Sequence, residues 1–231
     1  MDLAHLVQTI SIYALPVIFG ITLHEAAHGY VAKHFGDTTA YVLGRVSLNP
    51  VRHIDLVGTI IVPLVILLAT SWGAGQGMLF GWAKPVPVNY HALRKPKRDM
   101  MWVAAAGPAA NLAMALGWAL TAKLALVLPG NYFTDPLFLI SQAGVTVNLV
   151  LMLLNLIPLL PLDGGRIVAG ILPRKLAWRY AKAERWGGYL LLAFIAASLV
   201  DSWRFDGKYL GALFAPLSAL IEKIVRTIVA L

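Results

Sequence analysis

His24-Glu25-Ala26-Ala27-His28 lies inside an apolar stretch that runs from about Leu6 to Val31. Residues four apart on a helix lie on the same face, so the two histidines can offer nitrogens to one metal ion. Zinc held by two such histidines and a carboxylate lowers the pKa of a bound water to about 7, and Glu25 would accept the proton. The stretch therefore predicts a hydrolytic metal site on an apolar helix. The competing interpretation is two helix-end histidines with a solvent-reaching Glu25.

The composition indicates an integral membrane protein. Of the 231 residues, 59% are hydrophobic and 13% are charged, and the mean hydropathy is +0.73, which is too apolar for a water-soluble domain. We expect the first apolar stretch to be retained, because no Lys or Arg precedes it and it carries the metal motif. The absence of cysteine leaves only nitrogen and oxygen ligands for a metal. The sequence predicts one membrane-embedded domain over residues 1–231, with a core at about 6–175 and C-terminal helices at about 187–231.

Apolar runs along the chain predict an all-α polytopic membrane protein with about five to six transmembrane helices. Most of these runs are long enough to span about 30 Å. They are Leu6–Val31, Ile54–Trp72, Met100–Leu128, Leu137–Leu160, Gly187–Val200 and Tyr209–Leu231. The last run fits a surface-lying amphipathic helix as well as a span, and both interpretations stay open.

Basic residues predict the orientation. Most of the 19 Lys and Arg lie after the first run, before the third, after the fourth and in the C-terminal tail. The positive-inside rule puts these segments on the cytoplasmic side and the N-terminus outside. This distribution accounts for the net charge of +8 without nucleic acid, and it also suits contact with anionic lipid.

The stretch 54–83 has to enter and leave the membrane on the same side, because both of its ends come out cytoplasmic. Pro63 and the glycines of 73–77 predict a re-entrant segment. Its return limb, Phe80–Asn89, alternates like a strand, and Pro85 and Pro87 would restrict it to an edge. We expect a short membrane-embedded β-strand or β-hairpin that pairs with an extended substrate. A proline-stiffened loop is the alternative.

Two later motifs add polar groups. Residues 107–111 (Gly-Pro-Ala-Ala-Asn) combine small side chains, which allow close helix approach, with the Asn111 amide, which either joins helices or supports the metal ligands. Residues 155–166 (Asn-Leu-Ile-Pro-Leu-Leu-Pro-Leu-Asp-Gly-Gly-Arg) contain prolines that break a helix, glycines that permit a tight turn and one carboxylate. Asp163 alone fits an ordinary cap or turn residue. Beside an intramembrane His-Glu-x-x-His motif, we predict that it is the third metal ligand.

Together these motifs resemble those of the site-2 proteases, zinc metalloproteases that cut transmembrane substrates within the membrane. The three motifs occur in the family's order, and residues 48–58 and 81–85 are similar to a compact prokaryotic branch without a PDZ domain. The resemblance covers about residues 15–175. It implies that His24, His28 and Asp163 bind one Zn²⁺ per chain. It also implies that Glu25 is the general base and that Asn155 binds the substrate or stabilises the oxyanion.

The predicted function is therefore an intramembrane zinc endopeptidase of regulated intramembrane proteolysis, in a prokaryotic inner membrane with its active site toward the cytoplasm. The predicted partners are a transmembrane protein or peptide and the lipid bilayer, without nucleic acid. A metal-ion transporter or regulator that uses the same ligands without catalysis is the main alternative, and a hydrolase of a small lipid-borne amide is a third. Glu25 discriminates between them, because a transit site has no evident need for a general base.

The remaining histidines are His5, His34, His53 and His91. They lie near predicted membrane boundaries and lack the spacing of metal ligands. We interpret them as interfacial or loop residues.

Overall fold

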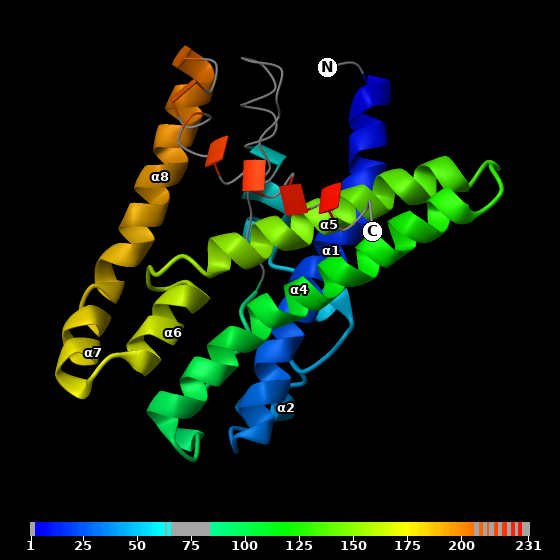
Figure 1. The fold of residues 1–231 in the computed structure, drawn as a ribbon. Coiled ribbons are helices and arrows are strands. Elements are labelled where there is room, and N and C mark those ends of the chain that lie inside the picture. The colour runs from blue at the N-terminus through cyan, green and yellow to red at the C-terminus, as the bar shows by residue number, and fades with distance from the viewer. Residues whose placement is uncertain are drawn as a thin grey trace.

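The computed structural model describes residues 3–62, 64–65, 84–205, 208–209, 212, 215–216, 219–220, 223–224 and 226–227. Its elements, labelled as in Figure 1, are mostly α-helices joined by short 3₁₀ and π-helical turns. In chain order they are α1 (Leu3–His34), α2 (Thr39–Val42), η1 (Pro50–Arg52), η2 (Leu56–Ile61), η3 (Tyr90–Ala92), α4 (Pro96–Val127), α5 (Thr134–Asn155), α6 (Asp163–Ile171), α7 (Arg174–Ala181) and α8 (Glu184–Phe205).

Three of the described helices are long and apolar enough to cross a membrane. They cover Val7–His34 in α1, Pro96–Val127 in α4 and Thr134–Asn155 in α5. These spans identify a membrane protein, as the composition predicted. The count of five to six spans stays a prediction, because residues 66–83 and most residues after 205 lie outside the described part of the chain.

Small side chains let the long helices approach one another closely. Helices α4 and α5 lie side by side, run in opposite directions and cross α1 (Figure 1). Ala115 and Ala119 of α4 pack in a buried cluster with Val145 and Leu149 of α5. Without a hydrophobic driving force between helices in lipid, such close packing is what holds the helices together. It also fixes the positions of the polar side chains that the three helices carry.

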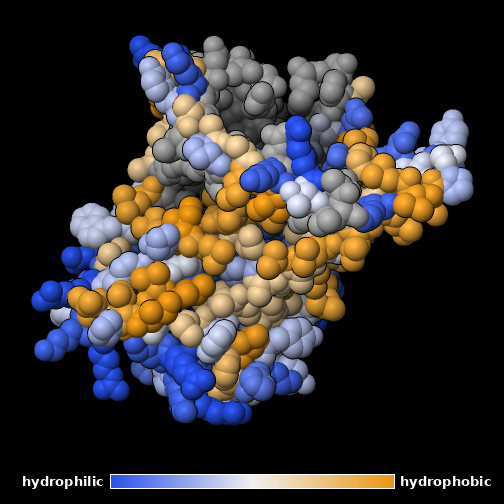
Figure 2. Space-filling view, viewed as in Figure 1, coloured by the Kyte–Doolittle hydropathy of each residue, from blue (hydrophilic) through white to orange (hydrophobic). Residues whose placement is uncertain are grey.

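The surface supports the same interpretation. Figure 2 shows hydrophobic side chains in a broad band across the molecule, with hydrophilic side chains gathered below it, at the end where Figure 1 places α2 and α7. Leu116, Leu120 and Leu124 are exposed at 48%, 70% and 54% along one face of α4. Leucines exposed in this pattern suit contact with lipid acyl chains rather than with water.

The fourth apolar run ends as a helix earlier than its hydropathy predicts. Helix α5 stops at Asn155, whereas the run continues to Leu160. The reason is the pair of prolines that follows, because Pro158 and Pro161 lack the N–H group that a continuing helix would need. The next helix, α6, begins at Asp163. The break therefore places Asn155 and Asp163 at the two ends of one connecting loop, residues 156–162.

The strand expected within Phe80–Asn89 is not found in the part that the structure describes. Residues 84–89 form neither helix nor strand, and residues 80–83 lie outside the described chain. Pro85 and Pro87 cannot donate hydrogen bonds. The N–H groups of the segment bond elsewhere: Lys84 to the carbonyl of His53, Val86 to Glu25 and Asn89 to Asp37. The proline-stiffened loop is the better description of 84–89.

Two further expectations concern residues that are described only in part. The run Ile54–Trp72 starts with the π-helical turn η2, but the predicted return through 66–83 falls outside the described residues. The run Gly187–Val200 is helical, as part of α8. Only scattered residues beyond 205 are described, so whether Tyr209–Leu231 spans the membrane or lies on it stays open.

Candidate metal centre

His24 and His28 lie one turn apart on α1 and point in the same direction. Their Nε2 atoms are 3.1 Å apart, and their rings stand nearly perpendicular, with centroids 4.7 Å apart. Both side chains are buried. This is the arrangement that a spacing of four residues on a helix predicts.

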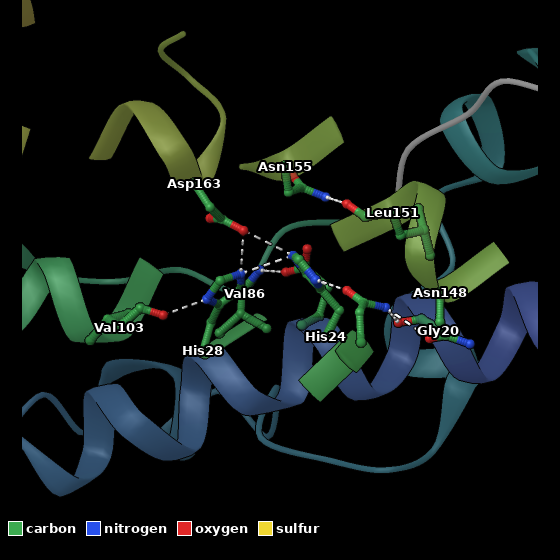
Figure 3. Close-up of polar contacts among 11 residues, drawn as sticks. Gly20, His24, His28, Val86, Val103, Asn148, Leu151, Asn155 and Asp163 are labelled. Atoms are coloured by element: carbon green, nitrogen blue, oxygen red, sulfur yellow. Dashed lines mark hydrogen bonds and ion pairs between the residues drawn. The ribbon is translucent and has the colours of Figure 1, made fainter. Parts of the chain in front are cut away.

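Asp163 reaches the two histidines from a different helix. Its Oδ2 atom lies 3.1 Å from Nε2 of His24 and 3.3 Å from Nε2 of His28 (Figure 3). Gly164 and Gly165 make this position accessible, because a Cβ atom on either one would collide with the backbone of residues 156–160. The structure therefore brings together the three side chains that the sequence proposed as ligands, across the break that follows α5.

Hydrogen bonds at the Nδ1 atoms determine which nitrogen of each histidine carries the proton. Nδ1 of His24 lies 2.5 Å from Oδ1 of Asn111, and Nδ1 of His28 lies 2.7 Å from the carbonyl oxygen of Val103. Both partners are acceptors, since the Asn111 amide group donates to the carbonyl of Gly20 and to Asn148. Each Nδ1 therefore carries the proton, and each Nε2 presents a lone pair to the centre.

The residues present fit a metal ion. Two Nε2 lone pairs and the buried Asp163 Oδ2 converge, with all three atoms within 4.8 Å of one another. Burial raises the pKa of the Asp163 carboxyl, but His24 and His28 in their protonated forms lower it by more, to about 2, through hydrogen bonds and charge, so the group is ionised at neutral pH. A bound cation would take the place of those protons. Converging lone pairs and a negative charge call for a cation. Two imidazoles and one carboxylate are a ligand set that zinc accepts.

Asn111 and Asn148 extend the centre into the helix interfaces. Both side chains are fully buried, and Asn148 donates in turn to the carbonyl of Gly144. The chain of hydrogen bonds runs from α5 through α4 to His24 on α1 (Figure 3). Asn111 thus fills both roles that its sequence left open, because it joins helices and orients a histidine of the cluster.

Gly107 lets α4 pass directly beside the cluster. A Cβ atom at this position would lie 2.5 Å from His24 Cε1 and 2.5 Å from His28 Nε2. Real Cβ atoms do not come that close, so any side chain here would displace one of the rings. The small residue of the Gly-Pro-Ala-Ala-Asn motif is therefore required by the positions of the two histidine rings as well as by close helix packing.

Glu25 stands beside the cluster without joining it. Its Oε2 atom accepts a hydrogen bond of 2.8 Å from the backbone N–H of Val86. Arg45 holds the neighbouring backbone through the carbonyls of Lys84 and Pro85, at 2.9 and 3.3 Å. The loop at 84–86 thus fixes the direction of the Glu25 carboxylate.

A cavity of about 170 Å³ joins these groups. It is lined mainly by α1, the loop at 84–89, α4 and the start of α6; the polar residues among its lining are His24, Glu25, His28, Asn155, Asp163 and Arg166. Asn155, at the end of α5, donates one amide hydrogen to its own helix, at the carbonyl of Leu151 and a distance of 3.0 Å. The amide group has a second N–H bond. The residues proposed for catalysis therefore share one cavity with the cluster.

Sequence reasoning missed several of these contacts. The carbonyl of Val103 and the N–H of Val86 belong to the backbone and leave no mark in the sequence. Asn148 was visible, because it is an amide inside a strongly apolar run and lies two turns before Asn155. Arg166 was predicted only as one of the basic residues that orient the chain, whereas the structure places it in the lining of the cavity.

His34, His53 and His91 stay out of the cluster. His34 and His91 are exposed, as predicted for interfacial or loop residues. His53 lies in the loop after η1, as predicted, but it is 2% exposed and its Nε2 bonds to the carbonyl of Ser47. The His5 side chain lies outside the described atoms.

Comparison with known proteins finds relatives along most of the chain. A Bacillus subtilis protein named as a candidate zinc metalloprotease, YwhC, is 37% identical over 193 residues, which is 80% of this chain and 80% of the relative. The candidate zinc metalloproteases Rip2 of Mycolicibacterium smegmatis and of Mycobacterium tuberculosis are 24% and 26% identical over 196 residues, which is 83% of this chain and 69% of each relative. No protein-family model matches the chain. No solved structure matches it either.

Proposed function

Because this chain belongs to the site-2 protease-like family of zinc metalloproteases, we propose that it is an intramembrane endopeptidase that hydrolyses peptide bonds within or near transmembrane segments. One observation carries the proposal. Two histidine nitrogens of the apolar helix α1 converge with the Asp163 carboxylate of α6, and Glu25, which is not one of the three, lines the same cavity. A metal site with a spare carboxylate beside it suits hydrolysis.

In this proposal the cluster holds one zinc ion per chain through His24, His28 and Asp163. When bound, zinc supplies a Lewis acid that activates water and polarises the scissile carbonyl. Asn111 and the carbonyl of Val103 keep the two rings turned so that their lone pairs face the ion. The protein thus holds the ligands in position before any substrate arrives.

Glu25 moves the proton. Its carboxylate takes a proton from the attacking water and delivers it to the leaving amine of the cut peptide. Val86 holds Oε2 through its N–H, which leaves Oε1 as the oxygen that can face the water. The loop at 84–86 therefore serves to aim the base.

The membrane setting determines which substrates react. A helical substrate hides its peptide bonds in its own hydrogen bonds, so it has to unwind before attack. We propose that the chain lies in a prokaryotic inner membrane with its N-terminus outside. The basic ends of α1 and α4 would then put the metal centre toward the cytoplasmic side.

Substrate helix stability gives a test of this proposal. In proteoliposomes, a transmembrane peptide with a Gly-Gly pair at mid-helix should be cut with a kcat/KM at least about tenfold higher than a peptide with Leu-Leu there. Each glycine weakens a helix by about 1 kcal/mol, and 1.4 kcal/mol is tenfold in rate. Fragments are identified by mass spectrometry. A peptide with the glycines outside the bilayer is the control. Equal rates of cleavage for the three peptides, or no cleavage of any of them, would contradict intramembrane proteolysis.

Asn155 is proposed to donate its second amide hydrogen to the carbonyl under attack. Replacing one such donor in a water-excluded site typically costs about 3 to 4 kcal/mol, so Asn155→Ala should lower kcat by about 10²- to 10³-fold. The zinc content should stay at one ion per chain. Asn155→Asp keeps the size but removes the donor, and it should be about as slow. Loss of zinc or of the fold in Asn155→Ala would instead make Asn155 structural.

A further inference from the structure

Helix α7 carries a cleft that the metal centre does not use. Its four lining residues, Arg174, Lys175, Trp178 and Arg179, all lie on this one helix, so the cleft is a shallow depression of about 400 Å³ that is wide open to the outside. The helix follows α6 after a two-residue link, at the hydrophilic end of the molecule (Figures 1 and 2). Three cations in one cleft repel one another, so the cleft is suited to an anion.

No acidic residue lies in the stretch of sequence around these cations. From Gly164 to Ala183 the sequence contains several Lys and Arg but neither Asp nor Glu. Among the described residues, Arg174, Lys175 and Arg179 form no ion pair with a carboxylate. Within the part of the chain that the structure describes, the positive charge of the cleft is therefore not neutralised by a carboxylate.

Trp178 adds an apolar wall to this charged cleft. The side chain is 62% exposed, and Nζ of Lys182 lies 3.5 Å from the centre of its ring. Trp186 and Tyr189, at the start of α8, are 57% and 67% exposed. Aromatic side chains exposed beside cations are typical of the membrane interface, where one end of the ring meets apolar chains and the other meets headgroups.

Two hydrogen bonds hold α7 in place. The Tyr180 hydroxyl donates to the carbonyl of Pro158 at 2.8 Å, and Lys97 of α4 donates to the carbonyl of Leu172, just before α7, at 2.5 Å. The helix that carries the cleft is thus attached to α4 and to the turn that precedes Asp163.

We propose that this cleft binds the phosphate of an anionic phospholipid. The phosphate lies among Arg174, Lys175 and Arg179, and the ring of Trp178 contacts the glycerol and the upper acyl chain. Arginine and lysine are the residues that bind such phosphates. A zwitterionic lipid is disfavoured, because its ammonium group would add a further positive charge to uncompensated cations.

The test measures which lipid lies next to Trp178. The full chain is placed in phosphatidylcholine nanodiscs that contain a small fraction of either brominated phosphatidylglycerol or brominated phosphatidylcholine, because bromine quenches tryptophan emission at contact. The difference between wild type and Trp178→Phe isolates the emission of Trp178. Phosphatidylglycerol should be preferred by about fivefold or more, which is the preference expected from one effective basic residue at the surface.

Charge variants identify the site. Arg174→Gln/Lys175→Gln/Arg179→Gln should bring the preference close to one, whereas Arg94→Gln/Lys95→Gln/Arg98→Gln, which removes equal charge before and at the start of α4, should preserve it. In wild type, 0.5 M salt should also reduce the preference, because it screens exposed charges. Equal quenching by both lipids in wild type would overturn the proposal. So would a preference that survives in the first variant or disappears in the second.

Discussion

His28→Ala and Asp163→Ala should each lose most of the zinc and all measurable cleavage. Each variant removes one of three converging atoms and leaves the other two without a third donor. Replacing even a residue that only orients a ligand typically costs about 10- to 100-fold in metal affinity. Loss of a ligand itself should exceed about 100-fold. Asp163→Ala also removes the negative charge that balances the ion.

Metal analysis of the purified protein in mild detergent measures this loss. His34→Ala is the matched control, because His34 ends the same helix but is exposed and lies outside the cluster. It should keep one zinc per chain. Unchanged zinc in both His28→Ala and Asp163→Ala would contradict the ligand assignment, whatever the variants do to activity.

The cluster could be anticipated from sequence because each part has a local signal. The spacing of His24 and His28 follows from the helical repeat, and prolines and glycines mark the break that carries Asp163. A carboxylate near the membrane is expensive unless it has a partner, which is why these distant residues were expected to meet. The distances between Asp163 and the two rings agree with that expectation.

Contacts that depend on packing could not be anticipated. The approach of α4 to α1 at Gly107 brings the Val103 carbonyl to His28, and only the crossing of two helices determines that contact. The expected strand failed for a related reason. Alternating residues at 84–89 suggested a pleat, but Val86 and Asn89 donate to side chains of Glu25 and Asp37 instead of a neighbouring strand. Alternation indicates which side chains share a face, but it does not supply a partner strand.

Glu25→Gln should separate metal binding from hydrolysis. Glu25 is not one of the three converging atoms, so this variant should keep one zinc per chain and still bind the transmembrane peptide. The amide of glutamine cannot take the proton from the attacking water. General-base catalysis typically contributes about 10²- to 10⁴-fold, so kcat should fall by that factor while substrate affinity changes little.

The matched control for this variant is Glu184→Gln, which makes the same chemical change at the exposed start of α8 and should cleave at the wild-type rate. Zinc content, peptide affinity and fragment yield are measured for all three proteins in the same nanodiscs. Glutamine can still accept a hydrogen bond from Val86 through its amide oxygen, so the loop at 84–86 should stay in place and the effect should be confined to proton transfer. If Glu25→Gln cleaves as fast as wild type, the peptidase mechanism is wrong. If wild type itself keeps its zinc but cuts no transmembrane peptide, a metal site that merely transports or senses the ion accounts better for the cluster.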